Sequence, residues 1–304
     1  SGLVTSDTVD LNASSGIGNT TGITLSSSNI TADTTIGDVE IANNLGTAVS
    51  VSSLTTGAGS VSFSQSGGGD VSTSSVSASV AVALSNAAGS LSLAGTVFAA
   101  SLDATATGAI TDGSNGDLAI AGLAEFTADS LELGNDAGNA TNFGTLTFNS
   151  TGSVTVSEDS SLDLVGTNTA GSASLVSVAG VSDAGAVSVN VSGLLDVSGT
   201  SIALGSGASV FNTGTLTFNS AGSVTVSEAS SLDLVGINTA STADLDSTAG
   251  VSDAGADSVN VTGLLDVSGT SIALGSGTSV FNTGTLTFNS AGSVTVSEDS
   301  SLDL

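Results

Sequence analysis

The chain has 304 residues, 28 acidic side chains and no lysine, arginine or histidine, so its formal charge is −28. Nucleic acid and anionic membrane surfaces are therefore poor partners, because phosphate groups are bound mainly through lysine and arginine. The chain also lacks cysteine, which excludes disulfide bonds and thiolate metal sites.

Residues 1–106 show strand-like alternation without an exact repeat. Segments such as "DTVDLNAS", "GITLSSSN" and "GSVSFSQS" alternate apolar and small polar residues, the pattern of strands with one buried face. We interpret residues 1–106 as degenerate coils of a β-solenoid and residues 107–143 as transition coils of the same solenoid. The most apolar region, Val76–Leu102, is interrupted by Ser, Asn and Gly, so no transmembrane helix is expected there.

Residues 144–213 and 214–283 are two copies of one 70-residue unit that differ at eleven positions without a gap. A partial third copy covers residues 284–304. Because the sequence stops within a copy, we expect the natural chain to continue beyond Leu304. Exact repetition of this kind is typical of repeat architectures, in which each unit packs against its neighbours.

The unit begins with three blocks of eight residues, each with apolar residues at its third and fifth places. This alternation predicts strands with inward apolar and outward polar residues. Ser174, Val176 and Val178 become Asp244, Asp246 and Thr248 in the second copy, which indicates an outward face. Val187, which becomes Asp257, breaks the alternation, and we place it at a corner before its strand begins. The predicted inward residues are Leu146, Phe148, Val154, Val156, Leu162 and Leu164, and the outward residues between them are Thr147, Thr155 and Asp163.

Three blocks of eight make 24 residues, and the remaining 46 divide into two lengths of about 23. We therefore predict an all-β fold, a three-sided parallel β-helix with about 23–24 residues per coil and three coils per copy. Phe148, Phe218 and Phe288 would then lie on one side, three coils apart.

The segments "GAITD", "FGTLTF" and "GSVTVSED" in residues 106–304 resemble repeats of bacterial surface proteins of the filamentous haemagglutinin type. The resemblance implies a right-handed parallel β-helix, export to the cell exterior, and a part in adhesion or in a surface coat. The chain departs from that family in having no N-terminal secretion domain, no Arg-Gly-Asp motif and no basic residue.

Paired carboxylates are the one catalytic arrangement that this composition leaves open, since a glycoside hydrolase needs only two acids. Candidates are Glu158 with Asp159, Glu298 with Asp299, and Asp163 near the first pair. We interpret these residues as solvated corner acids and predict that the chain is not an enzyme, because Asp159 is replaced by Ala229 in the next copy.

No cofactor or ordered metal site is predicted, and weakly bound Ca²⁺ is the alternative. Asp and Asn oxygens suit Ca²⁺, and the candidate ligands are the "SGGGD" segment, Ser66–Asp70, and the Asp244 and Asp246 pair. A threonine array of the ice-binding kind, begun by Thr147 and Thr155, is disfavoured because Asp163 takes the third place. Asn-x-Ser/Thr sequons occur at Asn12, Asn19, Asn29, Asn139, Asn149, Asn190 and Asn260.

These observations favour an extracellular structural segment of a large bacterial surface fibre or coat, which builds a long acidic β-solenoid. An adhesin that contacts glycans or other cells is the alternative. The partners expected are further copies or a continuation of the same fibre and a glycan or cell-surface partner, with no membrane insertion.

Overall fold

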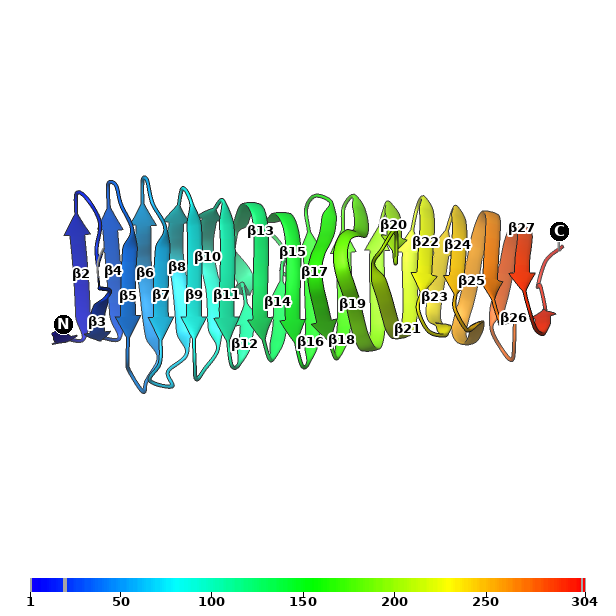
Figure 1. The fold of residues 1–304 in the computed structure, drawn as a ribbon, viewed down its shortest axis with the longest axis horizontal. Helices are drawn as coiled ribbons and strands as arrows, with labels where there is room; N and C mark the ends of the chain where they lie inside the picture. Colours follow the sequence, from blue (N-terminus) through cyan, green and yellow to red (C-terminus); the bar gives the residue numbers. More distant parts are fainter. Residues whose placement is uncertain (1, 19–20, 302, 304) are drawn as a thin grey trace. The chain divides into compact units, whose positions relative to one another are not determined.

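The computed structural model describes residues 2–18, 21–301 and 303, which form a parallel β-solenoid. The chain divides into two compact units, residues 1–158 and 159–304. Consecutive strands run in opposite directions across a coil, as β4 and β5 do in Figure 1, and each strand pairs in parallel with a strand of the next coil. The predicted fold class, an all-β parallel solenoid, is therefore confirmed.

The first unit consists of short strands and one 3-10 helix, η1 (Gly113–Asn115). Its strands are β1 (Leu3–Thr5), β2 (Thr8–Ala13), β3 (Ile23–Ser26), β4 (Asn29–Thr34), β5 (Val39–Asn43), β6 (Val49–Thr56), β7 (Val61–Gln65), β8 (Val71–Ala78), β9 (Ala81–Asn86), β10 (Leu91–Ala99), β11 (Ser101–Ala106), β12 (Ala109–Thr111), β13 (Leu118–Ala128), β14 (Ser130–Leu133), β15 (Thr141–Ser150) and β16 (Ser153–Glu158).

The second unit contains two strands of 20 residues. Its strands are β17 (Leu162–Ala170), β18 (Ser172–Ser177), β19 (Gly180–Gly199), β20 (Ser201–Leu204), β21 (Val210–Ser220), β22 (Ser223–Glu228), β23 (Leu232–Ala240), β24 (Thr242–Ser247), β25 (Gly250–Gly269), β26 (Ser271–Leu274), β27 (Val280–Ser290) and β28 (Val294–Val296). The strands of 20 residues are β19 and β25. Each pairs with several shorter strands along its length, as β19 does with β17, β18, β20 and β21. Strand β21 crosses the sequence boundary between the first two copies at residues 213 and 214.

The inward and outward alternation predicted from the sequence is present in both units. The six residues predicted to face inward, from Leu146 to Leu164, are all buried, whereas Val176, Val178, Asp244, Asp246 and Thr248 are exposed. Inward Leu, Val, Ile and Phe side chains stack on those of the next coil and form the core, which contributes roughly 25 cal/mol for each Å² of apolar surface removed from water.

The coils are shorter than the predicted 23–24 residues through most of the chain. In the second unit, Leu216 pairs with Leu234, 18 positions later, and Leu195 pairs with Leu216, 21 positions later. In the first unit the spacing ranges from 18 residues, between Ile23 and Ile41, to 23, between Leu118 and Thr141. Corners of different length and register shifts within strand pairs, as between Leu216 and Asn219 of β21, account for this range.

Shorter coils place equivalent residues of the two copies in different stacks of strands. One stack, the Ile202 series, runs from Leu162 through Val181, Ile202, Val224, Ala243 and Leu265 to Leu286. A second stack, the Leu195 series, runs from Ala173 through Leu195 and Leu216 to Leu234. A further set of pairs, the Ile272 series, runs from Leu232 through Val251 and Ile272 to Val294.

Ile272 is the equivalent of Ile202 in the next copy, but it lies outside the Ile202 series. In sequence it falls between Leu265 and Leu286, which lie three and four coils beyond Ile202. One 70-residue copy therefore spans more than three coils and fewer than four, not three. For the same reason the predicted alignment of phenylalanines is wrong, since Phe218 pairs with Val197 in the Leu195 series and Phe288 with Val267 in the Ile202 series.

Val187 lies within β19, not at the predicted corner. Its neighbours Ala186 and Ser188 pair with Gly166 and Thr167, which are adjacent in the chain, so Val187 has no pairing partner. This extra residue is a β-bulge, and it reverses the alternation locally: Val187 is 67% exposed and Val189 is fully buried. The bulge explains why an aspartate, Asp257, is accommodated at the same place in β25.

The bulge predicts opposite effects for one substitution at two neighbouring valines. Val187→Asp should change the free energy of unfolding by less than about 0.5 kcal/mol, because the side chain is in water. Val189→Asp should cost several kcal/mol or prevent folding, because it buries an unpaired carboxylate. Urea denaturation of the two variants and the parent chain measures the difference, and equal effects would contradict the assigned register.

Candidate functional site

Three buried aspartates hold the loops that interrupt the coils. Asp183 accepts hydrogen bonds from the backbone N–H of Gly205 at 2.7 Å and from the hydroxyl of Ser209 at 3.0 Å. Asp253 makes the equivalent bonds to Gly275 and Ser279. Gly205 and Gly275 have φ angles of 71° and 68°, a conformation that favours glycine. Asp112 binds Gly134 in the same way, and burial raises the pKa of its carboxyl.

The glutamates that follow the alternating strands point into the protein. Glu158 and Glu228 are each 1% exposed. Their Oε1 atoms accept hydrogen bonds from the backbone N–H groups of Phe143 and Thr213, at 2.8 and 3.1 Å. The interpretation of Glu158 as a solvated corner acid is therefore wrong, whereas Asp159 is exposed as expected. Alternation contains the signal for this burial, because Glu158 follows Val154 and Val156 at every second position of β16.

The other candidate acids also bind donors of the chain itself. Glu298 and Asp299 accept hydrogen bonds from the backbone N–H groups of Thr283 and Phe281 in β27, at 2.8 and 2.9 Å. Asp163 accepts one from the hydroxyl of Ser182 at 2.6 Å. These carboxyls satisfy corner and strand donors, which is a structural role.

An acidic row crosses the outward face of β24 and β25. Asp244 lies in register with Thr225 on one side and Asp266 on the other. Partial burial raises the pKa of Asp244, and the nearby charges of Asp246 and Asp266 raise it further. The carboxyl of Asp266 accepts a hydrogen bond from the hydroxyl of Thr287 at 2.7 Å.

The Ca²⁺ candidates do not come together as a metal centre. Within the described residues no group of three or more acidic side chains could hold a metal ion. Asp246 accepts a hydrogen bond from Ser268, and Asp70 accepts one from the backbone N–H of Ser90 at 2.8 Å. Thr147 and Thr155 lie in register with Glu125 and Glu132, so their rows are not threonine arrays.

The sequons lie mainly on outward positions. Asn190 and Asn260 are exposed residues of β19 and β25, and Asn139 is half-buried. Asn12, Asn29 and Asn149 are also exposed, and Asn19 lies outside the described residues.

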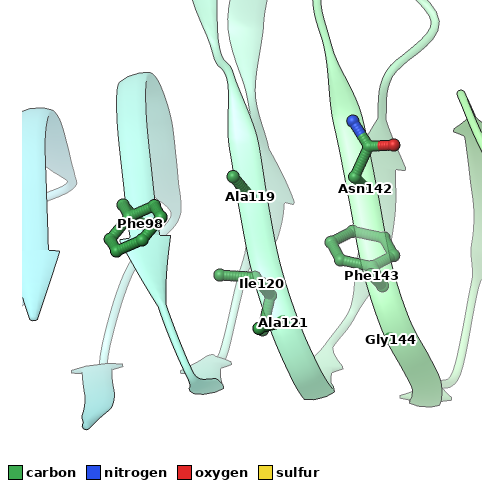
Figure 2. Close-up of a pocket in the computed structure, with 7 residues that line it drawn as sticks. All are labelled: Phe98, Ala119, Ile120, Ala121, Asn142, Phe143 and Gly144. Carbon is green, nitrogen blue, oxygen red and sulfur yellow. The ribbon is translucent and has the colours of Figure 1, made fainter. Parts of the chain in front are cut away.

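An apolar groove in the first unit is the feature that resembles a ligand site. Phe98, Ala119 and Asn142 occupy the same outward position on β10, β13 and β15, three successive coils. Because Ala119 is small, a hollow of about 290 Å³ remains between the ring of Phe98 and Asn142 (Figure 2). Phe98 is 53% exposed.

The floor of this groove belongs to the core. Ile120 and Phe143 are inward neighbours of Ala119 and Asn142, and the rings of Phe143 and Phe126 pack with their centroids 5.8 Å apart. Phe98 is not among the residues predicted as a site from the sequence. Alternation predicts its position, since Val97 and Ala99 on either side of it face inward.

No protein family model, no curated protein and no solved structure matches this chain. The class of protein is therefore defined by the structure alone, as a repeat protein with a parallel β-solenoid fold. The resemblance to filamentous haemagglutinin repeats stays a prediction. In the part of the chain that the structure describes, no helix is long and apolar enough to cross a membrane.

The role of the buried aspartates can be tested at Asp183. Asp183→Ala should destabilise the unit by about 1–3 kcal/mol, because the N–H of Gly205 and the hydroxyl of Ser209 lose their acceptor. Hydrogen exchange at the Gly205 amide should increase as the loop opens. Asp257→Ala, which removes an exposed acid, is the matched control and should leave the unfolding midpoint nearly unchanged. Equal midpoints for the two variants would refute the structural role of Asp183.

Proposed function

We propose that this chain is a structural segment of a bacterial cell-surface fibre or coat, in which repetition adds coils to an acidic β-solenoid. The observation that carries the proposal is the location of the positions at which the two full copies differ. All eleven positions that differ between residues 144–213 and 214–283 are exposed or half-buried in both copies, and every buried residue is identical. The repeat thus preserves packing between coils while its outer surface varies.

The placement of equivalent residues from successive copies in different series supports the same proposal. Since Ile202 and Ile272 belong to different series, an outward residue of one copy is not followed by its equivalent on the same stack in the next. Repetition therefore does not build one continuous row of a given outward side chain. A repeat that displayed one ligand site many times would favour a whole number of coils per copy.

The outer surface is uniformly acidic in sign. The second copy replaces Ser174, Val176 and Val187 by aspartates, although it lacks the acid present at Asp159. With no basic side chain in the chain, these groups remain hydrated and repel one another, which opposes non-specific association. The filamentous haemagglutinin resemblance is the source of the expected location outside the cell.

Insertion of one further copy of residues 214–283 after Thr283 tests the structural function. The longer chain should fold with an unchanged urea midpoint and gain about 14–19 Å in length, since three to four coils of about 4.8 Å are added. Length can be measured by electron cryo-microscopy, with a scrambled copy of the same composition as the control. An inserted copy that unfolds separately would argue against the proposal.

Antibody labelling of intact and permeabilised producing cells tests the location, and labelling only after permeabilisation would exclude a surface fibre.

Contact with neutral glycans is the second candidate function, and the Phe98 groove is the observation that favours it. An exposed aromatic ring supplies a flat apolar face for a sugar ring, and the Asn142 amide beside it can donate and accept hydrogen bonds. The net charge of −28 disfavours acidic glycans.

The glycan candidate predicts a loss of binding with one substitution. On an array of neutral glycans, Phe98→Ala should weaken binding by about 2- to 13-fold, in line with the loss of one stacking contact. Phe98→Tyr should retain binding because it keeps the ring. Val178→Ala, which removes another exposed apolar side chain, should have no effect. Absence of binding by the parent chain would exclude this function for the groove.

A further inference from the structure

Glu228 is a buried acid with one unsatisfied oxygen. It ends β22, immediately before the corner that leads to β23. Its Oε1 accepts hydrogen bonds from the hydroxyl of Ser230 at 2.9 Å and from the backbone N–H of Thr213 at 3.1 Å. Its Oε2 is buried without a partner. The carboxyl thus joins the corner to β21.

The surroundings of Glu228 favour the neutral form of its carboxyl. Burial raises its pKa to about 7, and the charge of Asp233 on β23 adds to the effect, whereas the hydrogen bonds from Ser230 and Thr213 oppose it. Strand β24 places Ser247 in register with Glu228, and Asp246 beside it faces outward. Leu204 of β20 pairs with Val226. No lysine, arginine or histidine exists in the chain to neutralise an anion here.

The corner at Glu228 connects several strands. Besides the bond from Thr213 of β21, the backbone carbonyl of Glu228 accepts a hydrogen bond at 3.0 Å from the N–H of Thr248, just after β24. The N–H of Ala229 donates to the carbonyl of Phe211 at 2.9 Å. Movement of this corner therefore disturbs hydrogen bonds to the preceding and following strands together.

We propose that Glu228 is a pH-sensitive latch, which holds the corner between β22 and β23 closed while its carboxyl is protonated and loosens the corner when the proton is lost. An ionised carboxylate at this place would be buried, without a cation, with one oxygen unpaired, and such a charge is costly. Opening the corner hydrates it. The device goes beyond the structural function proposed above, because it makes the cohesion between coils respond to acidity.

The direction of the pH effect follows from the two protonation equilibria. When the corner is open and hydrated, Glu228 has its ordinary pKa of 4.5, and when the corner is closed its pKa is about 7. The closed form therefore binds more protons between these values, so closure is strongest below pH 4.5 and weakens as the pH rises towards 7. Above about pH 8 both forms are almost fully ionised and little further change is expected.

The test is hydrogen exchange at the Thr213 amide, followed by NMR spectroscopy from pH 5.5 to 8 and corrected for the intrinsic rate. Ordinary carboxyls are already ionised in this range. The opening equilibrium constant should rise on the order of 30-fold from pH 5.5 to 8, with the slope decreasing above pH 7. In Glu228→Gln the rise should disappear, and in the exposed control Asp257→Asn it should remain. A parent chain whose Thr213 protection is the same at pH 5.5 and 8 would overturn the proposal.

A direct titration keeps the proposal testable if Glu228→Gln does not fold. The carboxyl ¹³C resonance of Glu228 in the parent chain should titrate with a midpoint near 7. A midpoint near 4.5 would show that the carboxyl is ionised at neutral pH within a closed corner, and the latch would be excluded.

Discussion

Hydrogen bonding between successive coils is the constraint on which the rest of this structure depends. Each strand pairs in parallel with the strand one coil later, as Val181 pairs with Ile202 and Ile202 with Val224. Backbone groups in a buried sheet need such partners, so the strands must stay in register over many coils. Since side chains alternate along a strand, register brings every inward residue onto another inward residue. Repetition of the buried sequence is one direct way to satisfy this requirement again and again.

The corners are where this requirement is relaxed, and buried acids of the adjoining strands supply some of the missing acceptors. A corner or loop leaves N–H groups without a partner in the next coil. Asp183 and Glu228 supply acceptors for such groups, to Gly205 and Thr213. These acids are buried in a protein that has no basic side chain, so hydrogen-bond donors of the chain stabilise them instead of ion pairs. Glu228 has one buried oxygen without a hydrogen-bond partner, and burial raises the pKa of its carboxyl to about 7.

The two candidate functions belong to different parts of the surface. In the second unit the outward residues vary between copies, and the pairing places equivalent residues of successive copies in different series. In the first unit Phe98, Ala119 and Asn142 form a single groove that the repeat does not reproduce. The proposed structural role rests on the buried residues, which are identical in the two copies. The proposed binding role rests on the Phe98 groove, which lies outside the repeat. The two roles are compatible, because the groove is built on the outward side of coils whose inward side packs normally.

The sequence by itself determined that the chain forms an all-β solenoid and which residues of most strands face inward or outward. It also showed that the outer surface accepts substitutions between copies. Alternation is a local property, which can be recognised within each block of eight residues, such as those that contain Leu146, Val154 and Leu162. It also contains the signal for Phe98, which lay outside the exact repeat and was overlooked. Only the tertiary structure decided the coil length, the different series of Ile202 and Ile272, the bulge at Val187 and the hydrogen bonds that Glu228 accepts. The physical reason is that these features depend on how many residues each corner absorbs and on which backbone donors it leaves unpaired, and both are settled by the neighbouring coils.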